Sequence, residues 1–202
     1  MDHQQIFPTN IFLVDNFIPL VTPTEKSDVA GMKKYISDLW SNRDYDNNWQ
    51  TKSADLHKKP EFQRFASLVK QYSKNICNHL SYDVDDIVIT DMWANVLKQG
   101  EHHNVHTHSN NFLSGTFYLQ SDQGASIVFH DPRPAAMITK LPMKNPSEVN
   151  YNTASVHIKP RPGTLVFFPA YVPHQFTVDD GSEPFRFIHF NLQAVRKIIV
   201  GE

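Results

Sequence analysis

The 202-residue sequence has a single cysteine, Cys77, and no excess of one charge, since 19 Lys and Arg balance 21 Asp and Glu. One cysteine excludes a disulfide framework and a cysteine-based zinc cluster, and is what a reducing compartment tolerates. The balanced charge gives no reason to expect a nucleic-acid partner. The apolar run at residues 9–14 is too short for a signal peptide or a membrane span. We therefore expect a soluble, cytoplasmic protein with no membrane partner, and a homodimer stays open.

Histidine, by contrast, is abundant: there are 11, and four of them lie between His102 and His108. The length, with 40% hydrophobic residues, suits one domain with one sizeable core. We predict a single domain over residues 1–202. Residues 1–85 would form a helical N-terminal support region, and residues 86–202 a β-rich catalytic core.

Two amphipathic helices are predicted in the N-terminal region, after a short strand at residues 9–14. Apolar residues recur every three or four positions from Thr24, which we take as the N-cap, to about Asn42. The same spacing runs from Pro60 to about His79. Each helix has one apolar stripe, so both are expected to cover one face of another layer.

From Asp86 onward the hydrophobic period changes from 3.6 to 2, which is typical of β-strands. The β-rich segments lie near residues 87–98, 104–119, 125–130, 153–159, 163–169, 174–178 and 184–193. Strands that follow helices in this order predict a mainly β fold, an antiparallel sandwich or barrel with the helices packed outside. A proline-rich loop at residues 131–150 has the length of a binding lid or of a disordered segment.

The clustered histidines predict a metal site. His106 and His108 are two residues apart, so in a strand they would point to one face with Cα atoms about 6.5 to 7 Å apart. Two such imidazoles can reach one Zn, Fe, Cu or Ni ion. A solvent-facing strand edge is the alternative interpretation. His102 and His103 point to opposite faces, and we interpret them as residues of the rim.

A third histidine, His174, follows Pro173 in a proline-bracketed turn that presents it in a defined direction. Residues 178–182 favour a three-residue hairpin loop, and that register sets His174 opposite Arg186, with Cβ atoms about 5 Å apart. An arginine beside a metal requires an anion between them, so this register predicts a carboxylate-bearing ligand. A four-residue loop would instead leave Arg186 solvated on an outer face.

These motifs occur in a recognisable order. The segments are His106-Thr-His108-Ser-Asn-Asn-Phe-Leu-Ser-Gly-Thr-Phe-Tyr118, Val-Phe-His-Asp131-Pro-Arg, Phe168-Pro-Ala-Tyr-Val-Pro-His174 and Arg186-Phe-Ile-His-Phe-Asn191. Together they resemble the 2-oxoglutarate- and Fe(II)-dependent oxygenases, and most of all a subgroup found in bacteria and marine phages. The resemblance covers roughly residues 91–193. It implies a double-stranded β-helix, or jelly roll, of eight core strands.

The resemblance also implies a reaction and a set of site residues. Fe(II) would be the metal, and 2-oxoglutarate and dioxygen would react with a prime substrate whose C–H bond is hydroxylated as 2-oxoglutarate becomes succinate and carbon dioxide. His106 and His174 would be iron ligands, and Arg186 and Tyr118 would contact the distal carboxylate of 2-oxoglutarate. Apart from the resemblance, we take Trp93, Asn95, Asn110, Ser114 and Asn191 as supporting or pocket positions, with a core role as the alternative for Trp93.

One position departs from the family at large, which reads His-x-Asp where this chain has His108. The third ligand is then His108, Asp131 from the Asp-Pro-Arg turn, or a water or halide. We favour His108 because its spacing from His106 already satisfies the geometry. The remaining histidines, among them His130, His157 and His189, are expected to be structural or at the surface.

Two other functions stay open. Gly100 followed by His106-Thr-His108 also matches the start of a cupin motif, which implies a metal-dependent isomerase or dioxygenase. A cupin would need a glutamate where Phe112 and Leu113 stand. A non-enzymatic jelly-roll binding protein is the second alternative, and it predicts neither turnover nor iron dependence.

Overall fold

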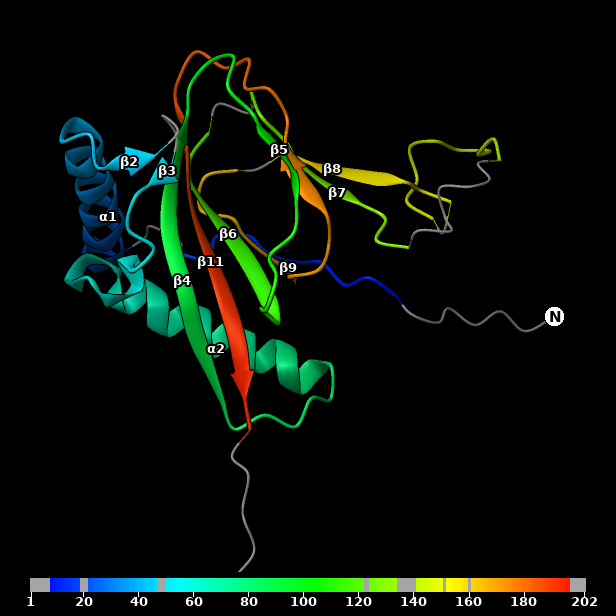
Figure 1. Cartoon of the computed structure of the whole chain (residues 1–202), viewed down its shortest axis with the longest axis horizontal. Helices are drawn as coiled ribbons and strands as arrows, with labels where there is room; N and C mark the ends of the chain where they lie inside the picture. Colours follow the sequence, from blue (N-terminus) through cyan, green and yellow to red (C-terminus); the bar gives the residue numbers. More distant parts are fainter. Residues whose placement is uncertain are drawn as a thin grey trace, which may run out of the picture.

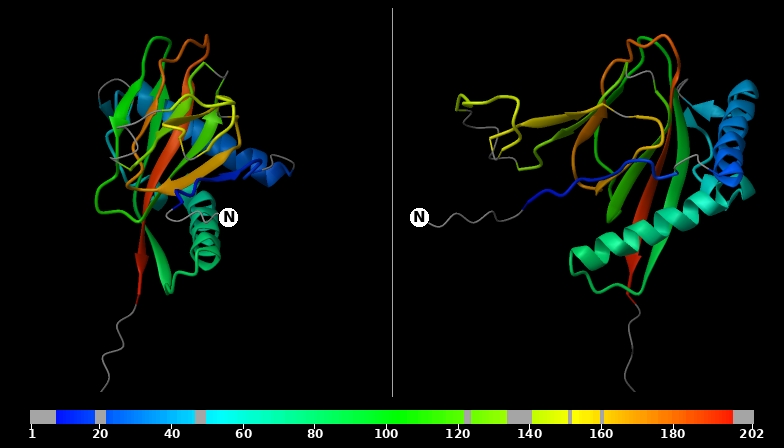
Figure 2. Two further views of the ribbon diagram at one scale, coloured as in Figure 1. Left: turned by 90° about the vertical axis from the view of Figure 1, so that its right-hand side faces the viewer. Right: turned by 180° about the vertical axis from the view of Figure 1, so that it is seen from behind.

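Two antiparallel β-sheets face each other, and two helices cover the outer face of the larger sheet (Figures 1 and 2). The computed structural model describes residues 8–18, 22–46, 50–121, 124–133, 141–150, 152–159 and 161–196. Its elements are β1 (Phe12–Val14), α1 (Pro23–Ser41), β2 (Tyr45–Asp46), β3 (Gln50–Thr51), η1 (Leu56–Lys58), η2 (Pro60–Phe62), α2 (Gln63–His79), β4 (Asp86–Leu97), β5 (His103–His106), β6 (Leu113–Gln120), β7 (Ile127–His130), β8 (Ser155–Ile158), β9 (Leu165–Pro169), β10 (His174–Phe176) and β11 (Phe185–Val195).

Both predicted helices are confirmed, with one correction at the start of α1. The N-cap is Thr22, not Thr24: its hydroxyl accepts the Glu25 N–H at 3.2 Å, and the Glu25 carboxylate accepts the Thr22 N–H at 2.9 Å. This reciprocal capping box, with Pro23 at the first helical position, satisfies amides that the helix leaves unpaired. α2 follows the η2 turn and ends at His79, as predicted. Neither helix in the described part of the chain has the length and hydrophobicity that a membrane span needs.

The strands form a seven-stranded sheet, in the order β1-β9-β6-β11-β4-β3-β2, and a four-stranded sheet, in the order β5-β10-β7-β8. The predicted jelly roll with helices outside is confirmed, and β4 to β11 are its eight core strands. The segment expected as one strand at residues 104–119 is two strands, β5 and β6. They are separated by a turn in which Asn110 has a φ of 61°, a left-handed conformation that no strand continues through.

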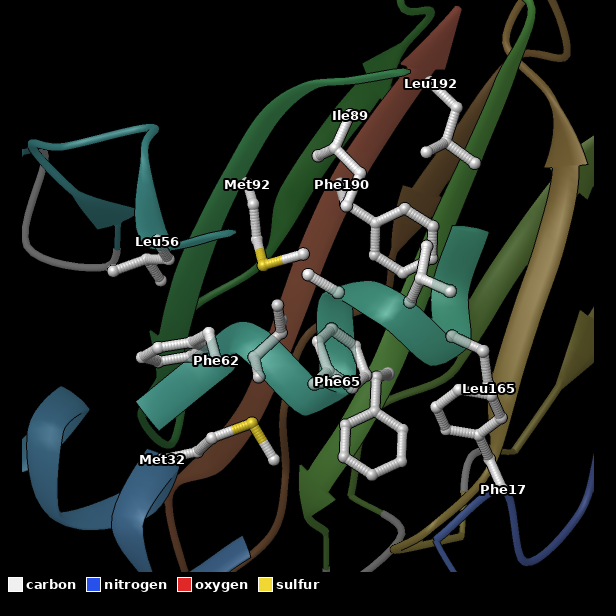
Figure 3. Packing of buried hydrophobic residues seen from close by; sticks show 14 of the residues in the cluster. Phe17, Met32, Leu56, Phe62, Phe65, Ile89, Met92, Leu165, Phe190 and Leu192 are labelled. Atoms are coloured by element: carbon white, nitrogen blue, oxygen red, sulfur yellow. The ribbon is translucent and has the colours of Figure 1, made fainter. Parts of the chain in front are cut away.

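Side chains on the two faces of the large sheet form two separate hydrophobic clusters. Outward-facing residues such as Met92, Ile188 and Phe190 pack in one cluster with the helices, where Phe65 of α2 lies against the sheet (Figure 3). Inward-facing residues such as Phe187 and Phe168 pack in a second cluster between the sheets. A period of two puts successive side chains on opposite faces, so the inner face of each strand points at the smaller sheet.

The predicted hairpin register between His174 and Arg186 is wrong. β10 pairs with β5 and β7 in the small sheet, whereas β11 pairs with β4 and β6 in the large one. The connection between them crosses from one sheet to the other instead of folding back. It is held by backbone hydrogen bonds in which Gly100 donates to Asp179 at 2.8 Å and Asp179 donates to Glu101 at 2.9 Å.

The proline-rich loop predicted at residues 131–150 lies between β7 and β8, which form a ribbon that extends away from the helices (Figure 2). Residues 134–140 of this prediction lie outside the described residues. Most of residues 141–150 are exposed. The prediction that this loop forms a lid therefore stays a prediction.

Candidate metal centre

Three imidazoles meet between the two sheets. Pairing of β10 with β5 places His174 directly opposite His106, and His108 follows β5 with its amide donating to the Ala170 carbonyl at 2.9 Å. Nitrogen atoms of His106, His108 and His174 all lie within 4.8 Å of one another. The Nε2 atoms of His108 and His174 are 3.3 Å apart. The three histidines singled out in the sequence are thus brought together from two strands and a turn.

Backbone carbonyls orient two of these rings. Nδ1 of His174 donates to the Val172 carbonyl at 3.0 Å, and Nδ1 of His106 donates to the Asn104 carbonyl at 2.8 Å. A carbonyl only accepts, so the proton of each neutral ring is on Nδ1, and Nε2 keeps its lone pair. Such a hydrogen bond fixes the tautomer and direction of a metal-binding imidazole.

Burial keeps the imidazoles uncharged. It is the main cause that lowers the pKa of His108 to about 3 and that of His174 to about 3, with a smaller contribution from His106 in each case. Burial also lowers the pKa of His106. Three neutral nitrogen donors that lie within 4.8 Å of one another are the kind of donor set that Fe(II) and other first-row divalent ions accept. The residues present therefore fit a divalent metal.

A fourth histidine, His189, belongs to the same cluster and was not expected there. It is 2% exposed, its ring centroid lies 4.3 Å from that of His108, and its Nδ1 is 3.0 Å from the Thr116 hydroxyl oxygen. Its Nε2 is buried without a hydrogen-bond partner among the described residues. The sequence did contain a signal, because His189 is two residues from Asn191 and so shares the face of that predicted pocket residue.

Four of the predicted supporting residues lie on the inner face of the large sheet. Trp93 pairs with His189 in register, with ring centroids 4.6 Å apart. The Ser114 hydroxyl donates to the Asn191 side chain at 2.7 Å. Asn95 is 1% exposed, and both polar atoms of its amide have no partner among the described residues. By contrast, Asn110 is exposed, and its backbone carbonyl accepts from Gln193 at 3.0 Å.

Tyr118 lies on this inner face too, in register with Phe187, which is in turn in register with Asn95. Its ring is fully buried, and its hydroxyl has no partner among the described residues. Burial raises the pKa of the Tyr118 hydroxyl far above its ordinary value, so it remains a neutral donor. The Asn95–Phe187–Tyr118 row therefore offers neutral hydrogen-bonding groups without a basic side chain.

Two predicted residues lie apart from the histidines. The Asp131 carboxylate is held by Arg133, with Nε to Oδ1 at 3.0 Å and Nη2 to Oδ2 at 2.8 Å, and it is not part of the metal-binding group. Arg186 lies on the outer face, where its Nη1 donates to the Ser37 hydroxyl of α1 at 3.1 Å. The structure does not bring Arg186 together with His174, because the Arg186 side chain leaves the outer face of β11, toward α1, whereas His174 lies on the inner side of the sheet.

Comparison with known proteins gives the class. The model of the family described as "Putative 2OG-Fe(II) oxygenase" matches residues 91–191, which are 101 of the 202 residues. No curated protein matches the chain by sequence. The chain belongs to this 2-oxoglutarate- and Fe(II)-dependent oxygenase family, with Fe(II) as metal and 2-oxoglutarate as co-substrate.

Solved structures agree with the fold. A prolyl-4-hydroxylase from Pseudomonas putida is similar at a TM-score of 0.62 and 11% identity, over 94% of this chain and 94% of that one. The non-heme alpha ketoglutarate dependent epimerase SnoN from nogalamycin biosynthesis has a TM-score of 0.64 at 9% identity, over 92% of this chain and 76% of that one. HygX from Streptomyces hygroscopicus, with nickel and 2-oxoglutarate bound, has a TM-score of 0.57 at 10% identity, over 92% and 83% of the chains.

Proposed function

We propose that His106, His108 and His174 bind the iron, and that the protein hydroxylates a C–H bond of a prime substrate while 2-oxoglutarate is decarboxylated to succinate. The observation that carries the proposal is the set of three neutral imidazoles whose nitrogen atoms lie within 4.8 Å of one another. Iron with bound 2-oxoglutarate supplies the oxidative decarboxylation that activates dioxygen, and the chain supplies ligands, orientation and a dry environment.

Aromatic residues shield one of the metal ligands, His174, from water, whereas His106 and His108 are partly exposed. Phe168 lies 4.6 Å from His174 between ring centroids, and Phe129 lies 6.1 Å from it. Both belong to the inner hydrophobic cluster. His174 is fully buried. Burial of this ligand strengthens its electrostatic interaction with the metal.

The hydroxyl of Tyr118 and the amide of Asn95 are proposed to hydrogen-bond 2-oxoglutarate. Both are buried on the inner face with polar atoms that have no partner among the described residues, so a bound ligand would relieve the cost of burying them. Arg186 is not included, because its guanidinium faces α1 on the other side of the sheet.

Succinate formation tests this function. The purified chain, given Fe(II), 2-oxoglutarate and dioxygen, is expected to form succinate, and the His174→Ala variant is expected to form none while keeping the circular dichroism of the parent. A cupin-type enzyme would bind metal and leave 2-oxoglutarate intact. A non-enzymatic jelly-roll protein would give no turnover and would respond to no metal.

A cytoplasmic location belongs to the same proposal, supported by the single cysteine, Cys77, which is buried and free. The balanced charge supports the absence of a nucleic-acid partner. A homodimer stays a prediction that light scattering of the purified chain tests. The prime substrate is open, and the region around residues 131–150 and the helices are where its selection is expected.

A further inference from the structure

A small cavity lies on the outer face of the large sheet, away from the histidines. It has a volume of about 150 Å³ and lies between α1 and the ends of β4 and β11. The polar residues of its lining are Ser37 and Ser41 of α1, Lys98 and Arg186, and Trp40 and Pro184 are among the apolar ones. The charged groups of this lining are all cations.

Arg186 is held at this cavity with unused hydrogen-bonding capacity. Its Nη1 donates to the Ser37 hydroxyl at 3.1 Å, whereas its Nε is buried and has no partner among the described residues. A guanidinium carries five N–H donors, and a buried unpaired donor is costly. An oxyanion in the cavity would accept hydrogen bonds from the guanidinium N–H groups of Arg186 that face it.

Two lysines add to the positive charge. Lys33 lies one turn before Ser37 on α1, and burial, together with the charge of Arg186, lowers its pKa. The Lys98 ammonium lies 5.7 Å from the centre of the Trp40 ring. The Glu101 carboxylate binds the backbone N–H of Lys98 at 2.8 Å.

None of the three cations forms an ion pair within the described part of the chain. Among the described residues, no carboxylate oxygen lies within 4.0 Å of the charged nitrogens of Lys33, Lys98 or Arg186. Like charges gathered around a partly buried cavity repel one another and favour an anion between them. The lining contains hydrogen-bond donors and no carboxylate, which also favours an anionic ligand.

We propose that the cavity between α1 and β11 binds a small oxyanion, a phosphate or carboxylate group, through Arg186, Lys98 and the Ser37 and Ser41 hydroxyls. The site is separate from the metal centre. Arg186 and His189 are on the same strand, but their side chains leave opposite faces of the sheet. A bound anion would tie α1 to the strands whose inner faces carry Trp93, Asn95 and His189.

Thermal unfolding of the metal-free full chain tests the site without using turnover. Phosphate is expected to raise the melting temperature saturably above a sodium chloride series of equal ionic strength, since a ligand of the folded state stabilises it. Arg186→Gln is expected to lose this rise. Because the substitution also removes a repelling charge, its melting temperature in chloride alone is expected to equal or exceed that of the parent.

The matched control is Arg196→Gln, which changes the same residue type just beyond the end of β11, where the side chain is 71% exposed and paired with Asp83. This variant should keep the full phosphate response. Succinate replaces phosphate in a second series, and the ligand with the lower half-saturating concentration identifies the preferred group. An equal rise in Arg186→Gln and the parent, or no rise above the chloride series with either anion, would overturn the proposal. Neither result bears on succinate formation at the metal centre.

Discussion

At the scale of single residues, burial of the metal ligands makes the stability of the metal-free protein depend on pH. The pKa of His174 falls from an ordinary value of 6.5 to about 3 in the folded chain. Above pH 6.5 the ring is neutral in both states, so burial carries no protonation penalty. As pH falls from 6.5 toward 3, the unfolded chain takes up a proton that the folded chain refuses, and stability is lost.

The free energy of unfolding should therefore fall on acidification, by up to about 1.4 kcal/mol per pH unit from His174 alone. Urea unfolding of metal-free protein between pH 7 and 5 measures the slope. His174→Gln should flatten it, whereas the same change at His157, which is exposed on β8, should not. Equal slopes in the parent and both variants would show that burial of His174 does not set its protonation.

A substitution of Tyr118 is expected to change the affinity for 2-oxoglutarate without lowering the stability of the protein. Its hydroxyl is buried without a partner among the described residues, so Tyr118→Phe should leave the melting temperature unchanged or raise it. The same variant should bind 2-oxoglutarate several-fold more weakly, because a hydrogen bond contributes about 0.5 to 1.5 kcal/mol. Calorimetric titration with a redox-inert divalent metal gives the affinity. Unchanged affinity would place the co-substrate away from Tyr118.

His108 and Asp131 were the two protein candidates for the third ligand. The Asp131 carboxylate is occupied by Arg133, which also lowers its pKa, whereas His108 lies 3.3 Å from His174 between Nε2 atoms. We expect His108→Ala to weaken iron binding by at least tenfold, which corresponds to a loss of about 1.4 kcal/mol of binding free energy. Asp131→Asn should leave the iron affinity within twofold of the parent. Competition with a chromophoric chelator measures both. The reverse ranking would assign the ligand to Asp131.

At the scale of elements, Gly115 in β6 leaves the space that the ring of Phe190 occupies in the cluster between the sheet and the helices. A Cβ there would overlap the ring of Phe190 and lie 2.9 Å from the Val166 carbonyl oxygen. Gly115→Ala should therefore lower the free energy of unfolding by about 1 to 3 kcal/mol. Gly31→Ala in α1, where nothing lies within 4 Å, is the matched control and should add up to about 1 kcal/mol. Similar effects of the two would contradict this packing.

Helices and strands were predictable because their hydrophobic periods are local. A few neighbouring residues are enough to recognise the apolar stripe of a helix, as from Phe62 to Ile76, or the alternation of a strand, as from Phe187 to Leu192. The true start of α1 was also readable, since Thr22 and Glu25 have the capping-box spacing. The partner of β11 was not readable. The length of the loop between β10 and β11 would predict their register only if these two strands were paired. Here the chain crosses from the small sheet to the large one between them.

At the scale of the whole molecule, the site is built from positions distant in the sequence. His106 and His108 lie near one end of the small sheet, His174 comes from the neighbouring strand, and His189 and Trp93 reach in from the large sheet. The sequence predicted the first three, from the spacing of His106 and His108 and from the proline-bracketed turn before His174. The others required knowledge of which face looks inward and of how the sheets are stacked, which only the assembled jelly roll defines.

The assembly also explains why Arg186 lies apart from the histidines that its motif suggested as neighbours. Successive side chains of a strand point to opposite faces of the sheet. Phe185 and Phe187 therefore point into the jelly roll, and Arg186 between them points to α1. The two faces of β11 thus contribute to two separate groups of side chains. One is the histidine cluster, and the other is the cationic cavity.

The most direct test of the metal centre is an anaerobic titration of the full chain with Fe(II) and 2-oxoglutarate, followed by visible absorption and iron content. We expect one iron per chain and the weak charge-transfer band of a chelated 2-oxoglutarate. His174→Ala should lose both, and Arg186→Gln should keep both. A parent protein without the band, together with a His174→Ala variant of unchanged iron content, would contradict the assignment.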